Sequence, residues 1–208
     1  MLGFGPAEVL SDRLCIISKQ NVSVSPMDIL ACCTICGMGC NGGYPDSAFQ
    51  YWMLNGVVSG GLYGQNNTCK QYFLKECDHH GAVSKRGPCP ASADTPDCEE
   101  KCNDEYKVEY EADKSYGATT YNIWPDEEML MEEIMELDSV SAIFSVYSDF
   151  LTYKEGIYQH VTGPYEGGHA IKIIGWGEEK EAKYWIVANS WNDGWGEEGF
   201  FRILRGND

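Results

Sequence analysis

A histidine and an asparagine in the last quarter of the chain have residue types and a spacing suited to catalysis. His169 follows two glycines and opens the apolar run HAIKIIGW, and Asn189 ends the next apolar run, 20 residues later. Catalysis by a cysteine needs a thiolate, a histidine that keeps it ionised and a third group that orients the imidazole. An asparagine oxygen can accept from the histidine ring, and Trp191 can shield that bond from water. A lone histidine is more often structural, but this pattern predicts two of the three parts.

Short strands are expected to position this pair. Four segments are rich in aromatic or β-branched residues and are bounded by Gly or Asn, as is typical of strands. One helix is expected among them at 125–137, where Leu130, Ile134 and Leu137 form an apolar stripe. The acidic residues around that stripe are interpreted as a solvated face. The expected strands lie at 141–147, 169–176, 184–189 and 199–204.

Helices are expected in the first part of the chain. Over residues 5–19, Leu10, Leu14 and Ile17 recur at helical spacing, which predicts an amphipathic helix. A third helix is expected at 47–55, after a glycine- and proline-containing turn.

The second of these helices has a recognisable start. Ser25 suits the N-cap, Pro26 suits the first helical position, and Asp28 is placed to complete a capping box. Residues 56–110 then show little periodicity and many Gly, Pro and Cys residues. Such a segment cannot be held by core burial alone, so crosslinks are expected there.

The bulk composition narrows the partners and the compartment. The 208 residues carry a formal net charge of −17, so nucleic acid and anionic membrane surfaces are not expected to bind. No apolar stretch is long enough to span a bilayer. Ten cysteines favour an oxidising compartment. The first residues, MLGFGPAEVLSDR, lack the basic and apolar regions of a signal peptide.

Several motifs in the same order resemble the papain family of cysteine peptidases, and cathepsin B within it. The resemblance runs over nearly the whole chain. It implies an α+β, papain-like two-lobe fold: a helical lobe at 1–110 carrying a disulfide-rich insert, a β-barrel-like lobe at 111–208, and an active-site cleft between them. The motifs are GGHAIKIIGWG, YWIVANSWNDGWGEEGFFRI and CNGGYP for the family, and SDRLCI, CCTICGMGCNGGYP, VSGGLYG and FSVYSDF for cathepsin B.

The resemblance implies roles for individual residues. His169 would be the acid/base partner of the thiolate and Asn189 its orienter, with Trp191 covering their contact. Gly42 and Gly43 would offer backbone groups to an extended substrate. Two further residues, Tyr44 and Ala170, would line nearby subsites.

His79 and His80 lie between Cys77 and Cys89, in a segment that resembles the occluding loop of cathepsin B. In that family the two histidines hold the C-terminal carboxylate of a substrate, which gives removal of dipeptides from the C-terminus. An imidazolium facing a carboxylate is favoured at acidic pH. The alternative is an exposed loop pair without a function.

The nucleophile is the missing part. The family motif CGSCW should precede the first helix, and counting back from Phe4-Gly5 places Met1 at the nucleophile's position. A thioether cannot form a thiolate. In the family the sequence continues past FFRILRGND to the residue at the base of the S2 substrate pocket, which this chain does not contain. The chain is therefore expected to be truncated at both ends.

The cysteines are expected to follow cathepsin B pairing, which leaves two without a partner. Cys15 and Cys40 would have their partners upstream of Met1. The four implied disulfides are Cys32–Cys98, Cys33–Cys36, Cys69–Cys102 and Cys77–Cys89.

Three functions remain open from the sequence. The first is a cysteine peptidase of an acidic compartment, lysosomal, endosomal or secreted, presented here without its nucleophilic segment. The second is a pseudoenzyme that binds peptides or inhibitors. The third is a zinc protein using Cys33, Cys36, Cys40, His79 and His80. We expect no cofactor and no metal, a monomer, and peptide or protein substrates or cystatin-like inhibitors as partners.

Overall fold

The computed structural model describes residues 3–80 and 86–206, and contacts within it group the chain into two compact units. Unit 1 comprises Met1–Glu76 and Ala91–Asn122, and unit 2 comprises Cys77–Pro90 and Ile123–Asp208. The contacts thus group residues 111–122 with the helices and residues 77–90 with the strands. The lobes at 1–110 and 111–208 remain a prediction. The expected nucleophile position, Met1, lies outside the described residues.

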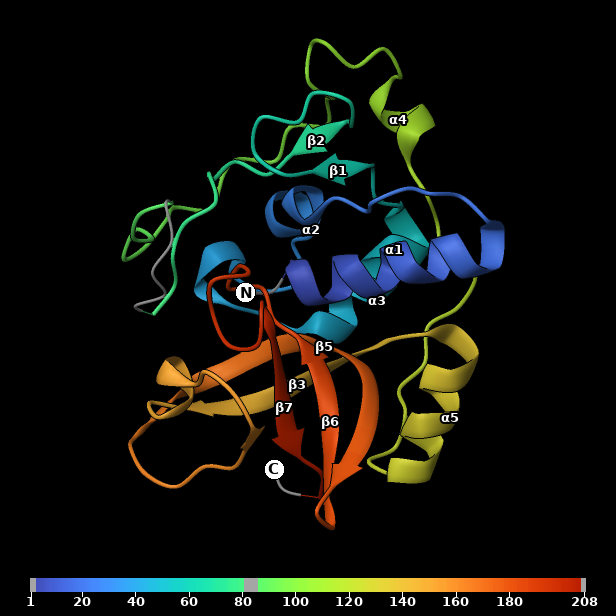
Figure 1. The fold of residues 1–208 in the computed structure, drawn as a ribbon. Helices are drawn as coiled ribbons and strands as arrows, with labels where there is room; N and C mark the ends of the chain where they lie inside the picture. Colours follow the sequence, from blue (N-terminus) through green and yellow to red (C-terminus); the bar gives the residue numbers. More distant parts are fainter. Residues whose placement is uncertain (1–2, 81–85, 207–208) are drawn as a thin grey trace. The chain divides into compact units, whose positions relative to one another are not determined.

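Unit 1 is built on the three expected helices (Figure 1). Their buried apolar residues contribute most of its main core. Leu10 and Leu14 are buried as predicted, but Ile17 is 69% exposed, so its assignment to the buried stripe was wrong. The helix ends one residue after it, and Ser18 is exposed as well. The helices are α1 (Phe4–Ser18), α2 (Pro26–Cys32) and α3 (Pro45–Asn55), with the short α4 (Tyr110–Asp113) and a 3-10 turn, η1 (Gly39–Asn41).

The start of α2 confirms one half of its predicted cap and corrects the other. The Ser25 hydroxyl accepts from the Asp28 backbone N–H at 3.1 Å, as an N-cap should. The Asp28 carboxylate does not complete a capping box, because it is fully buried and bonds elsewhere. The backbone N–H of Ser25 instead donates to Val58.

Disulfides staple the irregular part of unit 1. Cys32–Cys98, Cys33–Cys36 and Cys69–Cys102 are bonded there, and Cys77–Cys89 is bonded in unit 2. These are the four pairs that the resemblance implies. A small parallel pair, β1 (Gly60–Gly61) and β2 (Lys70–Gln71), is the only regular strand pairing described in unit 1 within residues 3–76 and 91–122.

Unit 2 is a five-stranded sheet with the order β3-β5-β6-β7-β4. Neighbours are antiparallel except for the short parallel pair of β4 and β7. The sheet is open, with β3 and β4 at its edges, so the barrel-like closure expected for this lobe is not present among the described strands. The strands are β3 (Val140–Tyr147), β4 (Ile157–Tyr158), β5 (Tyr165–Glu179), β6 (Ala182–Ala188) and β7 (Phe200–Leu204).

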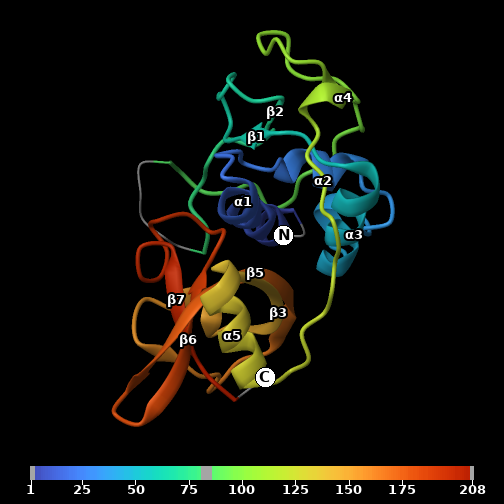
Figure 2. The same ribbon diagram turned by 90° about the vertical axis from the view of Figure 1, so that its right-hand side faces the viewer.

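Aromatic side chains fill the core of unit 2. Phe150, in the 3-10 turn η2 (Phe150–Thr152), is fully buried among other rings. The helix α5 (Glu127–Leu137) places Ile134 into the same cluster and turns its glutamates outward, as predicted. Figure 2 shows α5 lying along the sheet. Across residues 3–80 and 86–206, none of the helices has the length and apolar character to cross a bilayer.

Candidate active site

Two neighbouring strands of unit 2 bring His169 and Asn189 together. His169 lies in β5, opposite Phe144 of β3. Asn189 directly follows β6, which runs antiparallel to β5 and pairs Ala188 with Lys172. The two side chains therefore meet at the same end of the sheet although 20 residues separate them in sequence.

The histidine and the asparagine are directly hydrogen-bonded. His169 Nε2 lies 2.8 Å from Asn189 Oδ1, which also accepts from the Ser190 backbone N–H at 2.9 Å. Because an amide oxygen can only accept, Nε2 carries the proton in this arrangement. The other ring nitrogen, Nδ1, is then the basic nitrogen of a neutral imidazole. An oriented imidazole of this kind can exchange a proton with a sulfur nucleophile or a leaving amine.

Burial sets the charge state of His169. Its side chain is 5% exposed, and the Trp191 ring stacks on it with centroids 5.1 Å apart. Desolvation lowers the pKa of His169 to about 4, and positive charge on His79 and His80 acts in the same direction, against the hydrogen bond to Asn189. The imidazole alone is therefore neutral in mildly acidic water. A thiolate beside it would favour the imidazolium.

His79 and His80 gather on the same tryptophan. The His80 and Trp191 ring centroids are 4.4 Å apart, and the His79 ring stacks at 6.3 Å. Burial lowers the pKa of both histidines; the charge of His80 adds to the effect on His79, and Glu166 opposes it at His80. Three imidazoles thus surround one indole in unit 2.

Two polar contacts that the sequence analysis missed fix the segment carrying these histidines. Arg86 forms an ion pair with Asp193 at 2.5 Å, and the Asn192 side chain donates to the Cys77 carbonyl. Asp78 closes the base of the segment, because its backbone bonds Gly87 and Cys89. Asn192 and Asp193 directly follow Trp191 in the sequence. Their position next to a predicted site residue is the only sequence feature that could have indicated a role for them.

Asp149 forms another unpredicted cluster in unit 2. Its carboxylate accepts from the Val161 and Thr162 backbone N–H groups and from the Tyr158 hydroxyl. It also lies 3.1 Å from His160 Nδ1. Although desolvation opposes it, this set of donors holds the pKa of Asp149 well below its usual range. The cluster fixes the loop that leads into β5 and so towards His169.

The predicted substrate-binding turn belongs to unit 1. Gly42 has φ 104° and ψ 176°, a conformation that favours glycine, and its carbonyl accepts from Met38. Gly43 bridges to Gly37, and the Tyr44 side chain is 67% exposed. The turn is well formed in its own unit. Ala170, the other predicted subsite residue, is buried in β5 of unit 2. The joint role of these residues in binding stays a prediction.

The cysteines bear on the nucleophile and on the zinc hypothesis. Eight are in disulfides, and Cys15 and Cys40 are free and exposed in unit 1. Since Cys33 and Cys36 are bonded to each other, they offer no thiolates to a metal. Cys77, His79 and Cys89 lie close enough together to hold a metal ion, but their two sulfurs likewise form a disulfide.

Comparison with known proteins identifies the family of this chain. The family model for papain family cysteine proteases matches residues 2–208. The chain therefore belongs to the papain family of cysteine proteases.

Within that family the chain is similar to cathepsin B-like proteins. It is 46% identical to the cathepsin B-like cysteine proteinase of Schistosoma japonicum, over 99% of this chain and 60% of that protein. It is 47% identical to the cathepsin B-like cysteine proteinase 6 of Caenorhabditis elegans, over 99% of this chain and 55% of that protein. The chain thus spans a little over half the length of the relatives that it matches.

Solved structures give the same result for the fold. Procathepsin B S9 from Trypanosoma congolense matches with a TM-score of 0.82 and 35% identity, over 97% of this chain and 62% of that one. Digestive procathepsin L 3 of Tenebrio molitor matches with a TM-score of 0.67 at 22% identity, which supports the fold alone. The papain-like fold expected from the sequence is confirmed.

Proposed function

We propose that the protein hydrolyses peptide bonds by cysteine catalysis, with His169 as acid and base and Asn189 as its orienting residue. The observation that carries the proposal is the 2.8 Å contact between His169 Nε2 and Asn189 Oδ1 beneath Trp191. This contact leaves Nδ1 to serve a thiolate. His169 would protonate the leaving amine after thiolate attack and then take a proton from the water that hydrolyses the thioester.

The thiolate itself comes from a cysteine other than the ten in this chain. Eight of these are committed to disulfides, and Cys15 and Cys40 suit the structural pairing that the cathepsin B resemblance implies. The 208 residues alone are then inactive, and the whole protein is active if it supplies a cysteine at the family position. If the whole protein lacks that cysteine, the alternative function is that of a pseudoenzyme that binds peptides or inhibitors.

The test uses two proteins and one active-site variant. Reading the transcript around this coding region shows whether the family motif CGSCW occurs in frame. We expect the whole product to hydrolyse a dibasic fluorogenic dipeptide and to be labelled by an epoxide inhibitor of cysteine peptidases. His169→Ala should lower kcat/KM by roughly 10³-fold or more. Hydrolysis by the 208-residue chain itself, lost in His169→Ala, would overturn the assignment of the nucleophile.

The segment with His79 and His80 gives the proposed peptidase a second mode of action, the removal of C-terminal dipeptides. It is supported by the gathering of both rings on Trp191 and by the two contacts that fix the segment. A substrate carboxylate would favour the protonated imidazoles, whose own pKa values burial lowers. Dipeptide release should therefore fall as pH rises, more steeply than internal cleavage. Equal pH profiles for the two activities would contradict this mode.

The family also suggests a setting for this activity. We propose a monomer that acts on peptides and proteins in a lysosomal, endosomal or secreted location, subject to cystatin-like inhibitors, with extended substrates pairing along Gly42 and Gly43. Tyr44 and Ala170 are the further residues proposed to contact such substrates, each within its own unit. Gel filtration and the binding of a cystatin to the whole protein test these points.

A further inference from the structure

A buried lysine in unit 1 contacts one sulfur of a disulfide. Lys70 Nζ lies 3.5 Å from Cys32 Sγ, within hydrogen-bonding range for sulfur, and 2.7 Å from Asp28 Oδ1. Lys70 is 9% exposed and Asp28 is fully buried. An ammonium held at this place stabilises negative charge on the sulfur beside it.

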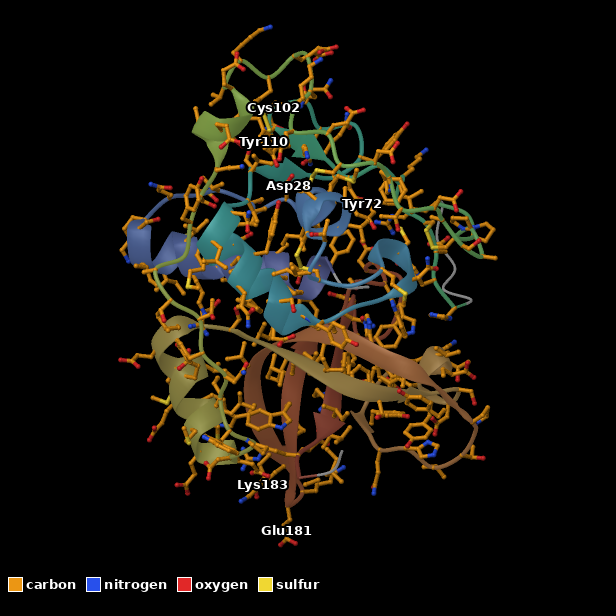
Figure 3. All side chains as sticks on the ribbon, turned by 180° about the vertical axis from the view of Figure 1, so that it is seen from behind. Asp28, Tyr72, Cys102, Tyr110, Glu181 and Lys183 are labelled. Atoms are coloured by element: carbon orange, nitrogen blue, oxygen red, sulfur yellow. A yellow bond between two sulfur atoms is a disulfide. The ribbon has the colours of Figure 1, made fainter. Side chains whose placement is uncertain are left out.

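The surrounding groups fix the position of that ammonium. The Tyr110 hydroxyl donates to Asp28 Oδ1 at 2.9 Å, and the Tyr110 ring lies 4.8 Å from Lys70 Nζ. The Val58 backbone N–H donates to the other carboxylate oxygen at 3.4 Å. Figure 3 shows Asp28 and Tyr110 pointing toward one another. Since Asp28 is held from several sides, Lys70 cannot leave it without breaking a buried network.

The two cysteines of this disulfide differ in exposure. Cys98 belongs to an exposed loop, whereas Cys32, at the end of α2, is 8% exposed. Thiol–disulfide exchange depends on which sulfur an incoming thiolate can reach and on how well the departing sulfur carries charge. At Cys32–Cys98 the exposed residue is Cys98, and the sulfur beside a cation belongs to the buried Cys32.

We propose that Cys32–Cys98 is a thiol-exchange site, in which a small thiol attaches to Cys98 and Cys32 leaves as a thiolate stabilised by Lys70. A thiolate of the glutathione class attacks Cys98 Sγ, the bond between Cys98 and Cys32 breaks, and its electron pair stays on Cys32. The product is a mixed disulfide on Cys98. The exchange needs no oxidant, and oxidation state is conserved because one disulfide replaces another.

The freed loop reaches the predicted substrate turn. Thr95 Oγ1 accepts from the Cys40 backbone N–H at 2.9 Å, and Cys40 Sγ donates to the Asp94 carbonyl at 3.6 Å. Gly39 lies so close to Thr95 that a Cβ there would overlap its side chain. Opening the disulfide releases the loop that bears on residues 37–44. Any effect of this release on substrate binding rests on the proposed function, whereas the exchange chemistry does not.

The primary test maps the product in the 208-residue chain with Cys15→Ser and Cys40→Ser, which removes competing thiols. Brief exposure to glutathione is followed by alkylation and peptide mass spectrometry. We expect glutathione on Cys98 and alkylation on Cys32, about tenfold or more above the reverse pattern. Cys69–Cys102, whose sulfurs are both buried, should stay intact. Glutathione mainly on Cys32, or earlier opening of Cys69–Cys102, would overturn the proposal.

A matched pair of variants tests whether the positive charge of Lys70 speeds the exchange. Lys70→Met should slow exchange at Cys98 on the order of tenfold relative to the half-buried Cys77–Cys89 in the same molecule, whereas Lys70→Arg should stay within about threefold. Lys70→Met leaves the buried Asp28 unpaired and can prevent folding. In that case the double variant Asp28→Asn/Lys70→Met, which removes both charges, should show the same slowing of exchange at Cys98. An unchanged ratio in the charge-free variant refutes the role of Lys70.

Hydrogen exchange tests whether thiol exchange at Cys32–Cys98 loosens the turn at 37–44. Amides in 37–44 should exchange faster in the mixed disulfide, while those of β5 should not change. This readout needs no peptidase activity, so it is independent of whether the proposed function is correct. Unchanged protection at 37–44 would show that opening Cys32–Cys98 does not affect the turn.

Discussion

The buried residues of unit 1 form two clusters, and both include disulfide sulfurs: Cys33 and Cys36 in one, Cys69 and Cys102 in the other. In unit 2 a single cluster holds twelve buried residues, six of them aromatic, and no cysteine. Large rings bury much apolar surface at little entropic cost, whereas an irregular chain buries too little to offset its ordering. The irregular part of unit 1 therefore depends mainly on covalent links, and the sheet of unit 2 on packing.

The dependence of unit 2 on packing is tested most strongly at Phe150. Its ring is fully buried, with the ring centroids of Phe144, Phe201 and Trp195 at 4.8–5.0 Å from its own. Phe150→Ala should cost about 3–5 kcal/mol in the free energy of unfolding, because it removes a large ring and leaves a cavity. Chemical denaturation measures the change.

Trp124→Ala provides the control in the same unit, since Trp124 is 77% exposed. It should change the free energy of unfolding by less than about 0.5 kcal/mol. Equal effects of the two substitutions would mean that the aromatic cluster does not hold unit 2.

The dependence of unit 1 on crosslinks is tested at Cys69–Cys102. This disulfide closes a loop with a sequence separation of 33 and has both sulfurs in a buried cluster. Replacing both cysteines with alanine should lower stability by about 2–4 kcal/mol, mainly by freeing the unfolded chain. Hydrogen exchange read by peptide should show the loss in unit 1. Equal loss of protection in β5 and β6 would contradict the separate stabilisation of the two units.

Acid should weaken unit 2 through His169. Its folded pKa is about 4, below the ordinary value of 6.5, because the neutral ring is buried. Between these values the unfolded chain binds a proton that the folded chain does not, so stability rises with pH there and is lost as pH falls from 6.5 towards 4. The loss should be on the order of 3 kcal/mol at most.

The matched variant is His169→Gln, which cannot titrate. Its free energy of unfolding should fall less steeply than that of the wild type over the same interval, and the difference between the two curves isolates His169 from the many carboxylates. Parallel curves would show that burial does not depress the proton affinity of this ring.

The regular elements could be predicted because their patterns are local. The stripe at Leu130 and Ile134, the cap at Ser25 and the apolar run after His169 each carry their own signal. The expected helices and strands begin and end within a few residues of their expected positions, whereas the short α4, β1, β2 and β4 were not predicted. Ile17 fits the same helical pattern but is exposed. Periodicity shows which face of a helix is apolar, but not which turns of that face pack against other elements.

Side-chain networks could not be predicted, because their members are far apart in sequence. Asp28, Lys70 and Tyr110 come from three segments, and only folding brings them together. The Asp28 side chain was assigned to the local cap because a local role was the only one visible from its neighbours. His169 and Asn189 could be paired because their residue types and spacing suit catalysis and the motifs around them are family motifs, whereas Arg86 and Asp193 had no such guide.

Substitutions at the two helix caps should give the smallest differences in stability between the units. Ser25 caps α2 in unit 1, and Asp126 caps α5 in unit 2 by accepting from Glu128 and Met129. Replacing either with alanine removes a bond to an otherwise unpaired helical N–H, which costs about 0.5–2 kcal/mol. Ser25→Ala should cost more, because the Ser25 hydroxyl also donates to the Lys70 carbonyl in the buried network, whereas the Asp126 bonds are exposed. Thermal unfolding of the two variants ranks them. The reverse order would mean that the network around Lys70 contributes little to unit 1, and that its disulfides carry the stability alone.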